Sequence, residues 1–281
     1  MSINELIVIS NRIRCKLVEM SNSARTPHLG SSLSCVDILV AAYWGTMNVN
    51  PEKPCEPERD RLILSKGHAA TALYISLAYK GFFPENILDT YAKHGSRLEE
   101  HPAPNCVPGI EAAAGSLGHG LPIGLGMALA GKIQKKNYRV FVVMSDGECN
   151  EGSVWEAAMF APAKKLDNVV AIIDFNKWQA TGRSCETMAL QPLKQKWEAF
   201  GWSTYEIDGN NLEELVETLG NTPDGNGKPV AIIANTIKGK GVSFMEDDNN
   251  WHYRIPTDEE VELARKELNQ SQNSQNCTEN I

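Results

Sequence analysis

The hydrophobic pattern of the chain alternates between short apolar runs and longer segments with helical spacing. The runs at 139–146 and 168–175 are almost continuously apolar, which is typical of strands that are covered on both faces of a sheet. Strands are predicted at 61–64, 139–146, 168–175, 204–207 and 229–236. Helices are predicted at 3–22, 35–46, 69–80, 121–134, 151–166, 192–200 and 212–219. Strands that alternate with helices predict an α/β fold: a doubly wound, mostly parallel sheet with helices on both faces.

Local signals refine this prediction. Ser34 is expected to cap the helix that begins at residue 35, and Pro162 is expected to kink the helix at 151–166. Residues 93–118 are rich in Pro, Gly and His and predict a long loop, which in a compact domain is usually functional. The polar, low-complexity end of the chain predicts a disordered tail at 266–281, after a single domain at 1–265.

Charge and composition exclude several classes of protein. The 281 residues carry a net charge of −8 and no run of five Lys or Arg, which disfavours nucleic-acid binding. The apolar runs are too short to span a membrane, and the first residues do not resemble a signal peptide. Seven cysteines without a CxxC pair argue against a disulfide framework or a structural zinc site. We therefore expect a protein of the reducing cytoplasm that binds neither nucleic acid nor membrane.

Two polar residues follow buried strands at matching positions. Asp146 ends one predicted strand, and Asn176 ends the next, 30 residues later. Because parallel strands present their carboxyl ends at one edge, both side chains are expected where α/β folds bind ligands. Their oxygens suit Mg²⁺ or Ca²⁺, while Gly147 and the following helix can approach a phosphate closely. Each residue alone would be an ordinary turn residue, but the pairing favours a metal–phosphate site.

Histidines give a second signal. Four of the six lie in turn or loop segments flanked by Gly or Pro, and imidazoles suit proton exchange with hydroxyl groups. These four are His28, His68, His101 and His252. His94 is expected at the surface. Lys238 and Lys240 could contact phosphate or lie in a solvated turn.

These segments together resemble the transketolase family. DGECNEG followed by Glu156, DRLILSKGH, GSLGHGLPIGLGMALA and KGKGVSFMEDDNNWH occur in the order of the family's diphosphate-binding half, over roughly residues 5–257. The last segment is similar to the end of this domain in two-chain transketolases. Several independent motifs in the right order make the resemblance specific.

The resemblance implies a site for thiamine diphosphate and Mg²⁺ (or Ca²⁺ or Mn²⁺). Asp146, Asn176 and the backbone carbonyl of Trp178 would hold the metal. The cofactor would be contacted by His68, Gly115, Ser116, Leu117, Gly147, Glu151, Asn176 and His252. The catalytic histidines that line the substrate channel would be His28, His68, His101 and His252. Glu151 and Glu156 would lie at a subunit interface that links two active sites.

Three departures from the family pattern concern this channel. Ser145 replaces the usual Gly before Asp146, Ala24 to Pro27 replace a run of small residues and His, and Tyr253 replaces the Gly after His252. His119 occupies the family's usual Gln position. These substitutions predict an altered channel wall.

The resemblance also implies a partner. The matching region is about half of a full transketolase, and the family's cofactor-activating glutamate lies in the other half. We therefore expect a separately encoded carboxy-terminal (pyrimidine-binding) transketolase subunit, which assembles with this chain as α₂β₂. The assembly would transfer a two-carbon ketol unit from a ketose to an aldose, and its substrates would be sugar phosphates or related anionic or sulfonated sugars. The alternatives are a component of a 2-oxoacid dehydrogenase or of a deoxyxylulose-phosphate-type synthase, and a non-catalytic partner-binding scaffold.

Overall fold

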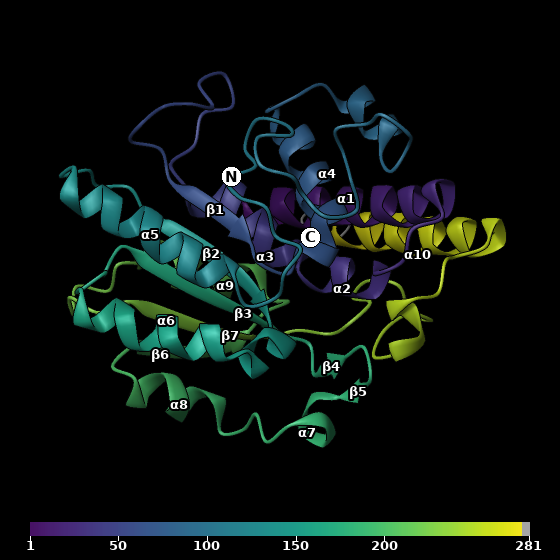
Figure 1. The fold of residues 1–281 in the computed structure, drawn as a ribbon. Coiled ribbons are helices and arrows are strands. Elements are labelled where there is room, and N and C mark those ends of the chain that lie inside the picture. The colour runs from purple at the N-terminus through teal and green to yellow at the C-terminus, as the bar shows by residue number, and fades with distance from the viewer. Residues whose placement is uncertain (277–281) are drawn as a thin grey trace.

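The core of the protein is one five-stranded parallel sheet (Figure 1). The computed structural model describes residues 1–276, and the side chains of residues 1–270. The strand order is β1-β2-β3-β7-β6, and every neighbouring pair is parallel. The strands are β1 (Arg61–Leu64), β2 (Val140–Ser145), β3 (Val169–Phe175), β6 (Ser203–Asp208) and β7 (Val230–Asn235). The predicted fold class and all five predicted strands are confirmed.

Helices cover both faces of the sheet, because side chains along each strand point alternately to the two sides. Phe141 and Val143 of β2 join one buried core, whereas Val142 and Met144 join the other. The first core is covered by α1 (Ile3–Ala24), α2 (Leu29–Ser34), α3 (Val36–Val40), α4 (Ala70–Lys80), α9 (Leu212–Gly220) and α10 (Asp258–Asn276). The second is covered by α5 (Gly120–Ile133), α6 (Gly152–Ala163) and α8 (Leu193–Ala199).

Two local predictions about helices are wrong. Ser34 does not cap a helix but ends α2, and its buried hydroxyl donates to Asp174 of β3 at 2.6 Å. The tertiary contact therefore decides the role of this serine. Pro162 lies in the last turn of α6, which stops at Ala163, so the proline accompanies the end of the helix and does not kink its middle.

The boundary predicted at residue 265 does not coincide with a break in the fold. Helix α10 continues through residues 266–276, so the predicted disorder is wrong for this stretch, and 277–281 lie outside the described residues. The helix lies along α1, where Leu268 is 1% exposed and Arg265 forms an ion pair with Glu19. One buried apolar side chain in a polar sequence was too weak a signal for a helix.

Short elements complete the chain. The sequence did not predict the hairpin of β4 (Trp178–Gln179) and β5 (Gly182–Arg183), or the turn of helix α7 (Ser184–Thr187). These lie beyond the carboxyl edge of the sheet (Figure 1). The remaining short helices are η1 (Ala41–Thr46), η2 (Gly67–Ala69), η3 (Glu85–Thr90), η4 (Asp146–Asn150) and η5 (Asn249–His252).

The strand register sets where the functional side chains can lie. Ser145, Asp174 and Ala234 are aligned neighbours on β2, β3 and β7. The residues that follow these strands therefore leave the sheet at a common edge. Asp146, Asn176 and Thr236 are placed there by the sheet alone.

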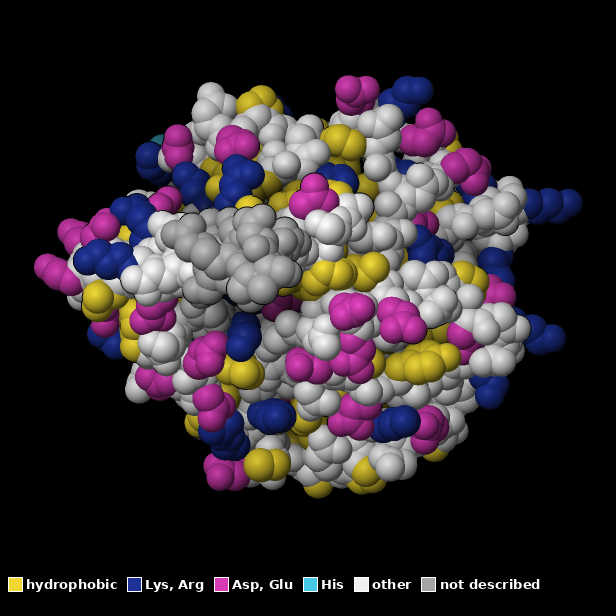
Figure 2. Space-filling view, turned by 180° about the vertical axis from the view of Figure 1, so that it is seen from behind, with side chains coloured by type: hydrophobic (Ala, Val, Ile, Leu, Met, Phe, Trp, Pro, Cys, Tyr) yellow, Lys and Arg dark blue, Asp and Glu magenta, His cyan; other side chains and the backbone are white. Residues whose placement is uncertain are grey.

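Surface properties agree with the exclusions drawn from composition. Figure 2 shows Lys and Arg interspersed with Asp and Glu on one face, with no single basic patch. Among the described residues no helix is long and apolar enough to cross a membrane. The six cysteines of the described part of the chain are all free.

Candidate functional site

Four histidines from distant parts of the sequence meet in one cavity of about 440 Å³. The ring centre of His28 lies 5.1 Å from that of His252, 5.4 Å from His68 and 6.3 Å from His101. His28 precedes α2 with φ of 69°, and its backbone N–H donates to the carbonyl of His252 at 2.8 Å. The structure therefore brings together all four histidines that the sequence singled out.

The electrostatics of the cavity keep three of these imidazoles neutral. Burial lowers the pKa of His28 to about 4 and that of His252 to about 3, and nearby cationic and imidazole groups add to both shifts. Burial likewise holds the pKa of His68 well below its usual value. At neutral pH these rings can donate and accept hydrogen bonds but carry no charge.

Asp146, Asn176 and Trp178 line the same cavity, together with Gly147. The Asp146 carboxylate accepts a hydrogen bond from Ser184 Oγ at 2.5 Å and from the Gly147 N–H at 2.9 Å. The side-chain carbonyl of Asn176 accepts from the Trp178 N–H at 3.1 Å. The predicted metal-binding residues are thus adjacent at the carboxyl edge of the sheet.

The donor set fits a hard divalent cation beside a phosphate. Asp146 is 1% exposed and has only neutral hydrogen-bond donors, so burial raises its pKa to about 6. A cation at this carboxylate would offset the cost of its burial. Gln179 Nε2, also at the cavity, is buried without a hydrogen-bond partner and could donate to a phosphate oxygen. Within the described residues no group of three or more His, Cys, Asp or Glu is arranged for a metal, so the predicted set relies on amide and carbonyl oxygens.

The predicted cofactor loop reaches the cavity only in part. Gly115 and Leu117 line it, whereas Ser116 is exposed and is not among the lining residues. This loop touches the turn before His68 so closely that a Cβ on Gly67 would lie 1.2 Å from the carbonyl oxygen of Ala114. Glycine at position 67 is therefore required for the loop to pack there.

Glu148 anchors this loop, a role that its sequence context did not reveal. Its fully buried carboxylate accepts hydrogen bonds from Ser65, from the Gly118 N–H at 3.0 Å and from the Ser145 N–H at 2.8 Å. Burial raises its pKa despite these donors. Ser145 completes a capping box with Glu148, which is a structural role for the residue that replaces the family's glycine.

The two glutamates predicted at an interface behave differently toward the cavity. Glu151 lines it, whereas Glu156 does not, and both side chains are exposed. The other two histidines of the chain, His94 and His119, are exposed and lie outside the cavity. Tyr253 forms part of the wall, with its ring 4.7 Å from His252 and 6.1 Å from His28.

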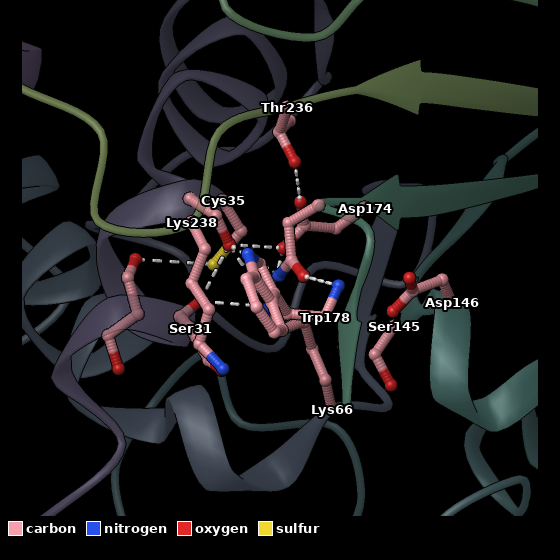
Figure 3. A network of polar contacts seen from close by, with 12 residues as sticks. Ser31, Cys35, Lys66, Ser145, Asp146, Asp174, Trp178, Thr236 and Lys238 are labelled. Atoms are coloured by element: carbon pink, nitrogen blue, oxygen red, sulfur yellow. Dashed lines mark hydrogen bonds and ion pairs between the residues drawn. The ribbon is translucent and has the colours of Figure 1, made fainter. Parts of the chain in front are cut away.

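A buried ion pair behind the cavity was not predicted from the sequence either. Lys66 and Asp174 are both fully buried, and the Lys66 ammonium contacts the Asp174 carboxylate (Figure 3). Ser34 and Thr236 also donate to Asp174, and Lys66 donates to the Ser31 carbonyl at 2.8 Å. Burial alone would lower the pKa of Lys66, but the Asp174 charge holds it above its usual value. One aspartate within an apolar strand was the signal available for this network.

Lys238 is buried, so the solvated-turn interpretation is wrong for this residue. Its ammonium donates to Asn249 Oδ1 at 2.7 Å and lies 3.1 Å from His252 Nδ1. Burial and the nearby Lys66 charge lower its pKa to about 8. Since an ammonium can only donate, His252 Nδ1 accepts, and the remaining ring nitrogen of His252 carries the proton. Lys240 instead pairs with Glu246 at 3.3 Å.

Comparisons with known proteins agree with this geometry. Residues 6–279 match the family model described as "Transketolase, thiamine diphosphate binding domain". The chain is 44% identical over 270 residues to one of the named subunits of the apulose-4-phosphate transketolase of Phocaeicola vulgatus, a match that covers 96% of each protein. It is 42% identical to a 6-deoxy-6-sulfo-D-fructose transketolase subunit of Clostridium sp., covering 92% of this chain and 94% of that protein.

A solved structure shows the same fold. The transketolase of Campylobacter jejuni superposes with a TM-score of 0.85 at 26% identity, over 98% of this chain and 48% of that one. The chain thus spans about half the length of this solved transketolase. The two relatives named as subunits, by contrast, are matched over nearly their whole length.

Proposed function

Because this chain belongs to the transketolase family, through its thiamine diphosphate-binding domain, we propose that it is one subunit of a two-chain transketolase. The complete enzyme would move a two-carbon ketol unit from a ketose to an aldose acceptor. The observation that carries the proposal is the convergence of four histidines with Asp146 and Asn176 in one cavity. The relatives are named as transketolase subunits, which disfavours the oxoacid dehydrogenase, synthase and scaffold alternatives.

We propose that Asp146, Asn176 and the Trp178 carbonyl hold Mg²⁺ (or Ca²⁺ or Mn²⁺), which in turn binds the cofactor's diphosphate. Gly147 leaves space for the phosphate, and the Gln179 amide supplies a donor. When bound, thiamine diphosphate would supply the carbon nucleophile that cleaves the bond next to a ketose carbonyl. Gly115, Leu117 and Glu151 would border it, and Ser116 would reach it only if the loop moves.

The histidines would handle the sugar. His68 and His252 lie beside the cofactor region, and His28 and His101 complete the cluster. Neutral rings can hydrogen-bond sugar hydroxyls and pass protons without repelling or trapping an anion. His252, whose Nδ1 accepts from Lys238, would present an N–H donor at Nε2.

The partner would supply the pyrimidine-binding half of the site. Relatives that match this chain over nearly their whole length are each named as one subunit of a transketolase, which implies a second chain in those enzymes. We propose that the partner here is a separately encoded carboxy-terminal chain and that the two assemble as α₂β₂. Glu151 and Glu156, both exposed, would face an interface. Free cysteines suit the reducing cytoplasm, which we propose as its location.

The substrates would be ketose and aldose phosphates or related anionic sugars, including sulfonated ones. One relative is named for a sugar phosphate and another for a sulfonated sugar. The test is to express the chain with the product of the neighbouring reading frame and assay ketol transfer with a panel of such ketoses. Transfer that requires thiamine diphosphate, a divalent metal and both chains is expected. A pair that binds the cofactor but transfers no ketol unit from any ketose would contradict the proposal.

A further inference from the structure

A cluster of contacts fastens the β4–β5 hairpin to the segment that carries His252. We call Trp178, Arg183 and Asp247 the hairpin clasp. The Arg183 guanidinium makes two hydrogen bonds to the Asp247 carboxylate, both 2.7 Å, and lies 3.7 Å above the Trp178 ring. The Trp178 indole N–H donates to the same carboxylate at 2.8 Å. Three side chains thus form one planar, bidentate and stacked unit.

Each end of the clasp leads directly to the candidate site. On one side Ser184, next to Arg183, donates to Asp146 at 2.5 Å. On the other side the Asp247 N–H donates to the Lys238 carbonyl at 2.8 Å, and Asp247 has φ of 57°. The clasp therefore links the metal–phosphate wall of the cavity to the histidine wall.

A second contact follows the same path. Asn249 donates to the Ala180 carbonyl in the hairpin at 3.3 Å and accepts from Lys238 at 2.7 Å. Lys238 in turn lies 3.1 Å from His252 Nδ1. The Arg183 hydrogen bonds lower the pKa of Asp247, which keeps this carboxylate ionised at neutral pH.

We propose that Arg183 and Asp247 are positioning residues that hold the hairpin closed over the cavity. Neither residue is among those that line the cavity. By fixing the hairpin they fix the Trp178 carbonyl, the Gln179 amide and Ser184 relative to His252. The proposal deepens the proposed function, because it assigns these residues to the retention of metal and cofactor.

An exposed ion pair contributes little to global stability, so the effect is expected in local opening. The hairpin has only two residues in each strand and few buried side chains, and the clasp supplies most of its contacts to the 237–252 segment. Loss of a bidentate pair and its stacked ring should raise the population of the open hairpin about tenfold. Cofactor and metal affinity should fall by a similar factor, with kcat at saturating cofactor nearly unchanged.

The experiment uses the chain together with its partner. Hydrogen exchange of residues 178–188 is measured without cofactor, and thiamine diphosphate affinity is then measured at fixed Mg²⁺. Arg183→Ala and Asp247→Ala should each raise exchange and weaken binding about tenfold. The charge-swapped pair Arg183→Asp with Asp247→Arg should recover much of both losses. Arg265→Ala, which removes an exposed ion pair on α10, is the matched control and should change neither.

A spectroscopic signature separates positioning from simple destabilisation. The Trp178 emission, obtained by subtracting the spectrum of Trp178→Phe, should shift when Arg183 is replaced, at temperatures where the fold is intact. Unchanged exchange and emission in Arg183→Ala, with normal cofactor binding, would overturn the clasp. A wild-type pair that binds no thiamine diphosphate at all, together with increased exchange in Arg183→Ala, would instead overturn the proposed function.

Discussion

Replacing Lys66 with Met should strongly destabilise the fold, because it leaves the Asp174 carboxylate buried without its cation. Both side chains of the pair are 0% exposed, and Met preserves most of the apolar stem of Lys66. Removing one partner of a buried ion pair typically costs about 3–5 kcal/mol. Two hydroxyl donors, from Ser34 and Thr236, remain on Asp174, which favours the lower end, about 3 kcal/mol.

Urea unfolding followed by circular dichroism at constant pH measures this cost. Lys66→Met with Asp174→Asn removes the stranded charge and keeps the hydrogen-bonding shape, so the double variant should be more stable than Lys66→Met alone. Lys132→Met is the matched control, because its ion pair with Asp167 is about one-third exposed and should contribute only about 0–1 kcal/mol. A cost below about 1 kcal/mol for Lys66→Met, or no recovery in the double variant, would refute this reasoning.

The other predictions concern the site. Asp146→Ala should abolish Mg²⁺-dependent thiamine diphosphate binding by the assembled pair, and unchanged affinity by calorimetry would contradict the metal assignment. His28→Ala and His101→Ala should raise the donor KM or lower kcat at nearly constant cofactor affinity, whereas equal loss of cofactor binding would make their role structural. Because burial lowers the pKa of Lys238 to about 8, the folded chain releases this proton before the unfolded chain does, and this group stabilises the fold as pH rises from about 8 to about 10.5. The ammonium that donates to His252 is lost over the same range, so kcat/KM should fall above pH 8 in the wild type but not in Lys238→Met.

The sheet and the two walls of the cavity were predictable because each rests on a regular pattern. Continuous apolar runs identify covered strands, and the register then brings Asp146 and Asn176 to one edge without further information. The histidines were found through their turn contexts and their motifs. Nothing local indicated that Glu148 would be buried, since its carboxylate is satisfied by Ser65 and Gly118, which are far from it in sequence.

The wrong predictions lie where tertiary contacts override local signals. Ser34 has the sequence of a cap, but its hydroxyl is used by Asp174. Lys238 has the sequence of a solvated turn, but the loop carries it into the interior beside His252. The polar sequence after residue 257 hides a helix whose buried contact is Leu268. Such residues can be assigned only once the packing partner is known.

The proposed role of this chain is to form half of a transketolase active site. The most direct measurement compares ketol transfer and molecular mass for the purified chain alone, for its genomic neighbour alone, and for the two mixed, with thiamine diphosphate and Mg²⁺ present throughout. We predict no transfer by either chain alone, transfer by the mixture, and a complex with the mass of two copies of each chain. Full activity from the lone chain, or a stable lone monomer that binds thiamine diphosphate as tightly as the pair, would contradict the account.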